Sequence, residues 1–382
     1  MTAEVEGPDG PERVRGRFLV GCDGMYSGIR ERAGIGFPGV TYPEVHRLGE
    51  VSLADGTTLL QSGDLDVPGV GIVPAGYTRT AAGVFAFGSF GGGVLGVQTI
   101  EDDPGGEDDR SEMRLDELRE SVLRVLGLDV PLGTPRRLSR YRHHARHADA
   151  YRAGRVLLAG DAAHVLPATG VARSLGMLDA ANLAWKLAAE VRGDAPAGLL
   201  DSYDAERRVA GERALLQAQA QVALRRGHDD AADALRSVVG ELLRDAQPQR
   251  RLAALIAGAD VRYPEPGDDV HPLVGSFVPD LPLQPLDGAA SGPDAFRRST
   301  AAARAVLLVL ADDGAPELAA TAAGWADRVD VVRAACADRP ADALLVRPDA
   351  HVAWAAGVGE DAATAAPALV ESLGRWFGAG VA

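Results

Sequence analysis

Two segments of the chain place glycine and aspartate directly after an apolar run, where such residues can bind a small molecule. The first is Phe18-Leu19-Val20-Gly21-Cys22-Asp23-Gly24, and the second is Arg155-Val156-Leu157-Leu158-Ala159-Gly160-Asp161. A glycine at the end of a strand lets a ligand approach the backbone, and an aspartate accepts hydrogen bonds from ligand hydroxyl groups. For Asp23 a second interpretation stays open, because this residue is also placed to cap a helix that begins near Ser27.

Histidine and cysteine give weaker indications of chemistry. His143 and His147 have the spacing of one helical turn, but no third ligand follows at a spacing typical of a metal site, so we predict no bound metal. His164 lies beside the second glycine–aspartate pair, where it either donates a hydrogen bond to a ligand or satisfies a loop carbonyl. The only cysteines, Cys22 and Cys336, are far apart in the sequence and predict no disulfide framework.

The elements that must position these residues are strands and amphipathic helices. Ala3 to Glu6 and Arg13 to Val20 predict a hairpin around Gly7-Pro8-Asp9-Gly10, and Arg155 to Ala159 predicts a buried strand. Glycine-punctuated runs between Val51 and Thr99 predict an antiparallel sheet. Helical spacing is found in residues 114–126, in a segment that starts near Gly176, and in residues 205–224 and 231–243. From Asp260 proline and glycine recur without periodicity, and a small α/β domain follows from about residue 275.

Composition excludes several classes of protein. The 382 residues are enough for two or three domains, and 54 acidic against 39 basic residues give a formal charge of −15, which would repel nucleic acid. The apolar run Ala305 to Ala311 is far shorter than the roughly 20 residues of a membrane helix, and the N-terminus has no signal sequence. We therefore expect a cytoplasmic protein without nucleic-acid or membrane partners.

Taken together, the two glycine–aspartate segments resemble those of the class A flavoprotein monooxygenases, in particular the FAD-dependent hydroxylases of aromatic polyketides. The resemblance extends over essentially the whole chain. It includes Pro167 and Gly170, Asp179-Ala180, Trp185-Lys186-Leu187, Ser202 to Arg207, and a thioredoxin-like last domain with Leu345-Val346-Arg347-Pro348-Asp349.

This resemblance implies FAD as cofactor and NADPH as reductant, with a polycyclic aromatic polyketide-like substrate. It places FAD near Asp23, Gly24, Gly160, Asp161, Pro167, Gly170 and Gly176. The N-terminal end of the helix beginning near Gly176 would face the pyrimidine side of the flavin. A homodimer is a further expectation, and the sequence identifies no catalytic residue.

Aromatic side chains of the central sheet are candidates for stacking on a flat substrate: Tyr77, Phe85, Phe87 and Phe90. Core packing is the alternative, because Phe85 and Phe87 share one face of a strand and the sequence does not say which face points inward. His164 and Arg173 are the polar candidates.

The resemblance also implies the fold: an α/β protein with a partial dinucleotide-binding domain, an antiparallel substrate sheet, a helical segment and a thioredoxin-like C-terminal domain. The predicted boundaries are 1–50 with 136–200 for the partial FAD-binding domain and 51–135 for the substrate sheet. They are 201–260 for the helical segment, 261–275 for a linker and 276–382 for the last domain.

Two features depart from the family pattern. In the family, a G-x-G-x-x-G turn between a buried parallel strand and a helix seats the pyrophosphate of FAD. The glycine runs at Gly34-Ile35-Gly36 and Gly91-Gly92-Gly93 do not substitute for it, because neither stands between such a strand and a helix start. In the flavin loop, the family continues after Pro-x-x-Gly with a second glycine, whereas Gly170 is followed here by Val171-Ala172-Arg173-Ser174-Leu175-Gly176, one residue shorter. Arg173 brings a charge close to this site.

These departures leave three hypotheses. The first is an FAD-dependent monooxygenase that hydroxylates a polycyclic substrate of polyketide tailoring, with weakened FAD binding. The second is an FAD-independent, redox-neutral cyclase or isomerase that holds a reactive conformer of a polyketide-derived substrate. The third is a non-catalytic partner of a full-length monooxygenase.

Overall fold

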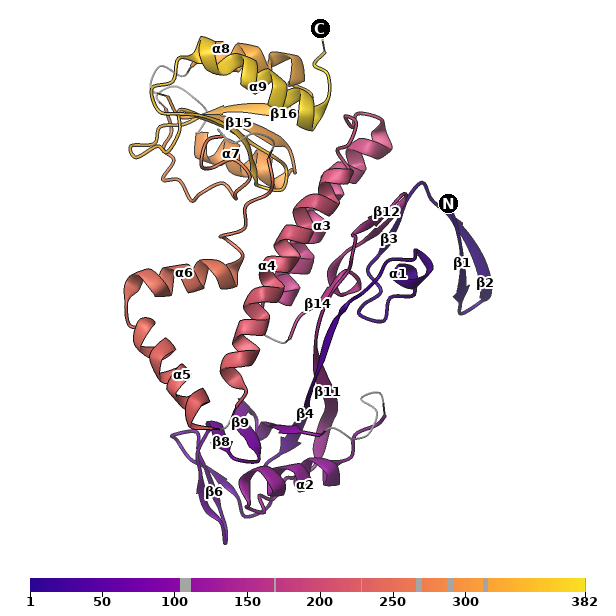
Figure 1. Cartoon of the computed structure of the whole chain (residues 1–382), viewed down its shortest axis with the longest axis vertical. Helices are drawn as coiled ribbons and strands as arrows, with labels where there is room; N and C mark the ends of the chain where they lie inside the picture. The colour runs from indigo at the N-terminus through magenta and orange to yellow at the C-terminus, as the bar shows by residue number, and fades with distance from the viewer. Residues whose placement is uncertain are drawn as a thin grey trace.

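A computed structural model describes residues 1–103, 111–167, 170–227, 229–265, 270–286, 292–311 and 315–381. The chain begins with the predicted hairpin, in which β1 (Thr2–Gly7) pairs antiparallel with β2 (Gly10–Arg15). This hairpin projects from the rest of the molecule (Figure 1). The predicted second arm, Arg13 to Val20, was wrong in its extent. It divides at Gly16, and its apolar end forms a separate strand in another sheet.

That separate strand is β3 (Leu19–Gly21), which lies parallel to β13 (Val156–Leu158) in a three-stranded sheet completed by β12 (Arg152–Ala153). Val20 is opposite Leu157, and the backbone N–H of Ala159 donates to Gly21 O at 3.0 Å. Since parallel strands end at the same edge, both glycine–aspartate segments leave the sheet side by side. The short helix α1 (Gly28–Arg32) follows β3, and the 3₁₀ turn η1 (Gly160–Ala162) follows β13.

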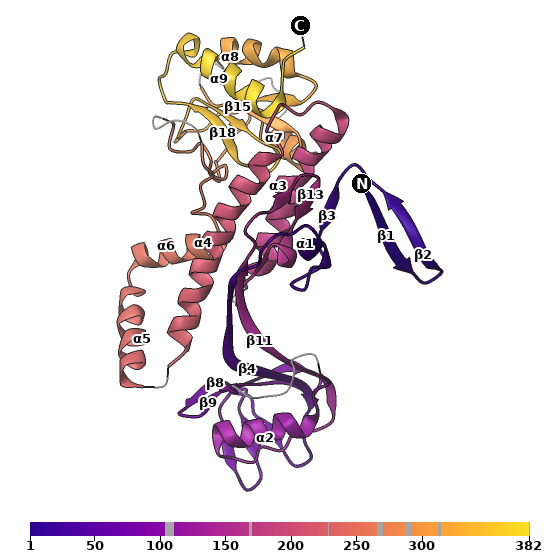
Figure 2. The same ribbon diagram turned by 45° about the vertical axis from the view of Figure 1, so that its right-hand side comes forward.

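A six-stranded antiparallel sheet forms the centre of the molecule. Its strand order is β14 (His164–Val165), β11 (Pro135–His147), β4 (Gly39–Ser52), β10 (Val94–Asp102), β9 (Gly83–Gly91) and β8 (Gly76–Thr80). The long strands β4 and β11 connect the region of α1 with the part of the sheet near α2 (Figure 2). The sheet therefore includes residues 39–50 and 136–147, which the expected span of 51–135 left out, because these two strands extend through both regions.

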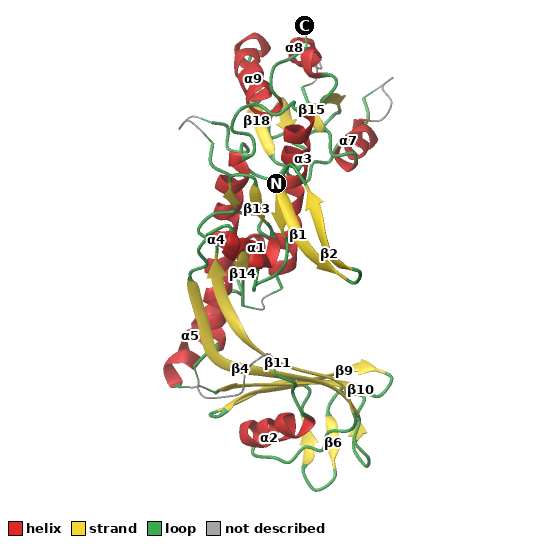
Figure 3. Ribbon diagram, turned by 90° about the vertical axis from the view of Figure 1, so that its right-hand side faces the viewer, coloured by secondary structure: helices red, strands yellow, loops and turns green. Residues whose placement is uncertain are grey.

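One face of this sheet packs on an apolar core. Helix α2 (Leu115–Leu126) and a small sheet of β5 (Thr58–Leu59), β6 (Leu65–Val67) and β7 (Gly71–Val73) cover it (Figure 3). Leu118 and Val122 of α2 are fully buried, as the helical spacing predicts. The open face, opposite α2, is turned toward the rest of the molecule.

Two long helices lie beside the three-stranded sheet, α3 (Ala172–Arg192) and α4 (Asp201–Arg225), and α5 (Asp230–Leu242) and α6 (Ala246–Ala257) continue from them (Figure 1). The predicted start of α3 near Gly176 was wrong, because the helix already begins at Ala172. Residues Val171 to Leu175 are a helical turn that buries Val171 and Leu175 against α4 rather than a flexible loop.

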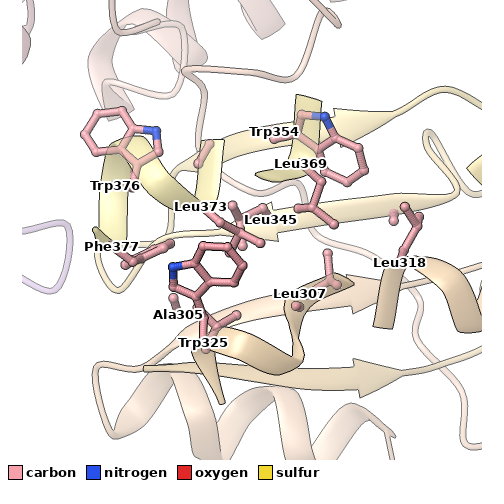
Figure 4. Packing of buried hydrophobic residues seen from close by; sticks show 14 of the residues in the cluster. Ala305, Leu307, Leu318, Trp325, Leu345, Trp354, Leu369, Leu373, Trp376 and Phe377 are labelled. Atoms are coloured by element: carbon pink, nitrogen blue, oxygen red, sulfur yellow. The ribbon is translucent and has the colours of Figure 1, made fainter. Parts of the chain in front are cut away.

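The last domain has a four-stranded sheet in the order β16 (Val329–Arg333), β15 (Ala305–Val309), β17 (Ala343–Val346) and β18 (Val352–Ala356), with β15 and β16 parallel. Around it lie α7 (Gly292–Ala301), α8 (Pro316–Thr321), η2 (Ala322–Trp325) and α9 (Ala362–Phe377). Figure 4 shows Trp325, Trp376 and Phe377 packed with Leu307 and Leu345 in one core of this thioredoxin-like domain.

The irregular segment before this domain is not a free tether. Tyr263 is 2% exposed, and its backbone N–H donates to Gly275 O at 2.9 Å. The expected linker 261–275 therefore contains a residue that packs in the interior. Among the described residues, no helix is long and apolar enough to cross a membrane.

Candidate functional site

The edge at which β3 and β13 end brings the two predicted segments together. Asp23 faces its own helix: its carboxylate accepts hydrogen bonds from Ser27 Oγ at 2.5 Å and from the Ile29 N–H at 3.2 Å. Ser27 in turn accepts from the Arg30 N–H at 2.9 Å. These contacts are those of helix capping, the second interpretation that the sequence left open. Gly24 lies next to Asp23 at a φ of 82°, in a turn that leads into the cap.

The Gly160–Asp161 turn has the properties of a ligand site. Gly160 has a φ of 63°, a conformation that L side chains adopt at a cost. Asp161 is exposed, and within the described parts of the chain no hydrogen bond or ion pair engages its carboxylate. A Cβ added at Gly176 would lie 3.2 Å from the Cα of Gly160, so α3 contacts the turn closely. The turn thus presents an exposed carboxylate on a backbone that α3 contacts from behind.

A buried carboxylate, Asp179 of α3, holds this turn. Its Oδ2 accepts from the backbone N–H of Gly160 at 2.9 Å and lies 2.7 Å from His164 Nε2, and its Oδ1 accepts from Arg207 Nε at 2.8 Å. Burial raises the pKa of Asp179, but His164 and Arg207 lower it by more, so that the net shift is downward. The sequence indicated Asp179 only as part of the family resemblance, although a carboxylate in the middle of an apolar helix was a signal in itself.

His164 is placed differently from both sequence interpretations. It is 0% exposed and contacts Asp179, so it faces the interior and neither a ligand surface nor a loop carbonyl. Its position directly after the η1 turn makes it a second support of that turn. The buried contact with Asp179 explains why a histidine stands there, and a role in contacting substrate stays a prediction.

The loop between this turn and α3 contains the other predicted cofactor residues. Pro167 is buried, and Gly170 is exposed with a φ of 84°. Arg173 and Gly176 both lie in the first two turns of α3, where Arg173 is exposed. The free N–H groups at the start of α3 therefore belong to residues near Ala172, four positions before Gly176.

The four aromatic candidates of the central sheet lie on its two faces. Phe85 and Phe87 are 1% and 4% exposed in the core against α2, with ring centroids 5.9 Å apart, so the core-packing alternative describes their position. Tyr77 and Phe90 are 75% and 72% exposed. A Cβ at Gly96 would lie 2.6 Å from the Phe90 ring, which therefore lies over β10 on the open face. Register also places Tyr77 opposite Ala86 on this face.

The open face has a polar aromatic cluster that the sequence analysis missed. His46 of β4 stacks on Tyr141 of β11 with ring centroids 4.9 Å apart, and it contacts His143 in a tilted arrangement with centroids 3.9 Å apart. His46 Nδ1 lies 3.2 Å from Gln98 Nε2, and Arg225 Nη2 of α4 lies 3.1 Å from His143 Nδ1.

Burial lowers the pKa of His46 to about 2 and that of His143 to about 4, so both rings are neutral at neutral pH. His143 lies on strand β11 and not on a helix, so the helical spacing to His147 is not realised. Among the described residues, no group of three or more His, Cys, Asp or Glu side chains is arranged to hold a metal ion.

Comparison with known proteins places this geometry in a family. Residues 1–218 match the FAD binding domain family, and residues 271–380 match the aromatic-ring hydroxylase C-terminal domain. The chain belongs to the FAD-dependent aromatic-ring hydroxylases. It is 39% identical to the 12-dehydrotetracycline 5-monooxygenase/anhydrotetracycline 6-monooxygenase of Streptomyces rimosus, over 99% of this chain and 73% of that protein.

Two further relatives carry different activities in their names. The structure of CabE, an aromatic hydroxylase from angucycline biosynthesis, superimposes with a TM-score of 0.82 at 36% identity, over 99% of this chain and 73% of that chain. A dialkyldecalin synthase of Streptomyces rugosporus is 37% identical over 99% of this chain and 73% of that protein.

The residues of this chain fit one half of FAD. The exposed carboxylate of Asp161 and the side-chain-free backbone of Gly160 suit the hydroxyl groups of a ribityl chain. For the ADP half, neither run with G-x-G-x-x-G spacing has the required setting: residues 34–39 lead from α1 into β4, and residues 91–96 join the antiparallel strands β9 and β10. A cavity of about 640 Å³ between α3 and the last domain includes no residue of the turn or of the open sheet face. The turn and the open face are therefore the candidate site, and this cavity is separate from both.

Proposed function

We propose that this chain is an FAD-dependent monooxygenase of aromatic polyketide tailoring, which hydroxylates a polycyclic aromatic substrate with NADPH as reductant. The observation that carries the proposal is the exposed carboxylate of Asp161, which has no partner among the described residues and lies on a turn that α3 holds in place. The names of the relatives support it, since one is an anhydrotetracycline monooxygenase and another an aromatic hydroxylase of angucycline biosynthesis.

Each part of the site has a distinct role in this proposal. FAD, when bound and reduced, supplies the activation of dioxygen and the transfer of one oxygen atom to an aromatic ring. Asp161 accepts hydrogen bonds from the ribityl hydroxyls. The N-terminal end of α3 carries partial positive charge from its free N–H groups, which favours negative charge on the pyrimidine side of the flavin. Arg173 adds a full charge in the same turn of the helix.

The open face of the central sheet is the proposed substrate surface. Tyr77 and Phe90 present large exposed rings, on which a flat polycyclic molecule can stack. Tyr141 and Gln98 offer polar atoms between the buried histidines and this surface. Because His46 and His143 are neutral, the face holds hydrogen-bonding groups without adding positive charge there. Phe85 and Phe87 support the strand from the opposite side.

Titration of the purified full chain with FAD, followed by visible absorption, tests the cofactor assignment. We expect a saturable shift of the flavin bands for the wild type, and an affinity about tenfold weaker for Asp161→Asn, because charge-assisted hydrogen bonds are lost. The matched control is Asp129→Asn, an exposed aspartate after α2, which should bind FAD like the wild type. A folded protein with no spectral change at high FAD contradicts the proposal.

A further inference from the structure

We infer that the C-terminal domain positions the cofactor turn of the FAD-binding domain, through a continuous chain of buried hydrogen bonds from Arg347 to Gly160. The chain crosses both long helices and joins residues 187 positions apart in sequence. Its meaning for catalysis rests on the proposed function, because the turn is the one on which Asp161 lies. Arg347 and Asp349 act through other residues and are therefore positioning residues.

The chain begins at Arg347, directly after β17 of the last domain. Its guanidinium is 1% exposed and donates from Nη1 to Glu206 Oε1 at 2.6 Å and from Nη2 to Glu206 Oε2 at 2.8 Å. It also donates from Nε to Asp349 Oδ1 at 3.0 Å. Two parallel bonds to one carboxylate fix both its distance and its orientation, which a lysine cannot do. Arg347 is therefore a rigid connection between the last domain and α4.

The middle of the chain links α4 with α3 and with the segment before the last domain. Asn182 Nδ2 donates to Glu206 Oε2 at 2.6 Å and to Asp349 Oδ2 at 3.0 Å, so one amide joins both carboxylates. Tyr263 Oη accepts from Arg207 Nη1 at 2.8 Å and lies 3.4 Å from the same Asn182 amide. Hydrogen bonds between polar side chains thus connect Arg347 and Asp349 of the last domain with Arg207 of α4.

The series of hydrogen bonds ends at the Gly160–Asp161 turn. Arg207 follows Glu206 on α4 and donates from Nε to Asp179 Oδ1 at 2.8 Å, while Asp179 Oδ2 accepts from the Gly160 N–H at 2.9 Å. Two consecutive residues of α4 therefore connect different parts of the protein: Glu206 bonds Arg347 of the last domain, and Arg207 bonds Asp179, which holds the turn. A displacement of α4 at Glu206 moves Arg207 with it, because both belong to the same helical turn.

The formal charges in this series of hydrogen bonds balance, so the loss of one charged group affects the groups that it contacts. Three carboxylates (Asp179, Glu206 and Asp349) face three cations (Lys186, Arg207 and Arg347). Burial raises the pKa of Glu206, but Arg347 and Lys186 outweigh it and lower that pKa to about 2, so Glu206 is ionised at neutral pH. In a buried site, the loss of one well-oriented partner leaves the remaining charge to find another. Such a rearrangement spreads along the connected groups.

Amide hydrogen exchange of the full chain without cofactor tests this inference. The variant is Arg347→Lys, which keeps the charge and removes the two-pronged geometry. We expect the amide of Gly160 to exchange about tenfold faster than in the wild type, while amides of β15 in the core of the last domain stay within about twofold. The control is Arg304→Lys, whose arginine bonds Asp330, Asp327 and Ala326, all within the last domain.

Three results overturn the inference. One is unchanged exchange at Gly160 in Arg347→Lys, and another is an increase that β15 shares equally, which is general destabilisation. The third is a Gly160 amide that exchanges in the wild type as fast as an exposed one. If Arg347→Lys does not fold, Arg207→Lys is measured in the same way, since it interrupts the chain one step from Asp179. The exchange result does not depend on FAD, so a failure to bind FAD would contradict the proposed function and leave this inference standing.

Discussion

The backbone N–H of Gly160 donates a hydrogen bond to Asp179 Oδ2 at 2.9 Å, which ties a turn at the end of a strand to the middle of helix α3. The same carboxylate holds His164 and Arg207. The exposed Asp161 therefore lies on a backbone that the interior of the protein fixes. Rigid support behind an exposed functional group is the arrangement that a cofactor site needs.

The two aspartates of this region should respond differently to the same substitution. Asp179→Asn removes the charge that compensates the buried Arg207, and we expect the free energy of unfolding to fall by about 3–5 kcal/mol. Asp161→Asn, with no partner among the described residues, should change that free energy by less than about 0.5 kcal/mol. Chemical denaturation of both variants measures this contrast, and equal losses of stability would disprove the assignment of their roles.

Two glycines with the same backbone conformation separate a cofactor effect from a folding effect. Gly160 and Gly154 have φ values of 63° and 61°, and at neither position would a Cβ meet another atom within 4 Å. Alanine should therefore cost about 1–2 kcal/mol of stability at each position, through backbone strain alone. Only Gly160→Ala should also weaken FAD binding in a titration, because its Cβ would project into open space at the turn that we propose to contact FAD. Equal FAD affinity in both variants would speak against a ligand at Gly160.

The faces of the central sheet predict opposite effects for two phenylalanines of β9. Phe85→Ala leaves a cavity in the core beneath α2 and should lower the free energy of unfolding by about 3–5 kcal/mol. Phe90→Ala removes a ring that is 72% exposed and should cost less than about 1 kcal/mol, while it raises the KM for a polycyclic substrate. Denaturation and steady-state kinetics check the two parts. An unchanged KM in Phe90→Ala would remove this ring from the substrate surface.

The buried histidines of the open face predict a loss of stability in acid. In the folded protein burial lowers the pKa of His143 to about 4, below its usual value of 6.5. Between these values the unfolded chain binds the additional proton, so the free energy of unfolding falls as the pH falls below 6.5, and it is fully regained above.

Replacing His143 with glutamine should reduce the slope of unfolding free energy against pH by up to about 1.4 kcal/mol per pH unit, the effect of one proton. Denaturation curves between pH 4 and pH 7 measure it. Tyr141→Phe is the control, because it keeps the ring stack and removes no group that titrates in this range. The same slope in His143→Gln and the wild type would show that His143 is accessible to protons in the folded state.

The sequence predicts the local elements of the site better than the contacts between residues that are distant in the sequence. Gly160 and Asp161 follow an apolar strand, and that local signal was sufficient to find the turn. Period two placed Phe85 and Phe87 on one face, but their inward direction depends on α2, which is distant in the sequence. The start of α3 was predicted too late, because the resemblance suggested a loop where Val171 and Leu175 pack against α4.

The polar network behind the site could not be found from local patterns. Asp179, Arg207 and Tyr263 bond one another across 28 and 56 residues of sequence, and nothing in the spacing of the three residues indicates this. Tyr263 stands in a segment rich in proline and glycine, a composition typical of a linker. Its burial results from contacts with α4 and the last domain, which only the folded chain brings together.

In the proposed function, the protein inserts oxygen from dioxygen into an aromatic substrate by means of FAD. The most direct measurement supplies the purified chain with FAD, NADPH, ¹⁸O₂ and a polycyclic phenolic probe such as anhydrotetracycline, and determines the product mass. We predict a product that contains one ¹⁸O atom and whose formation requires both FAD and NADPH. A product of unchanged mass, formed without oxygen uptake, would contradict the monooxygenase assignment and identify a redox-neutral enzyme on this fold.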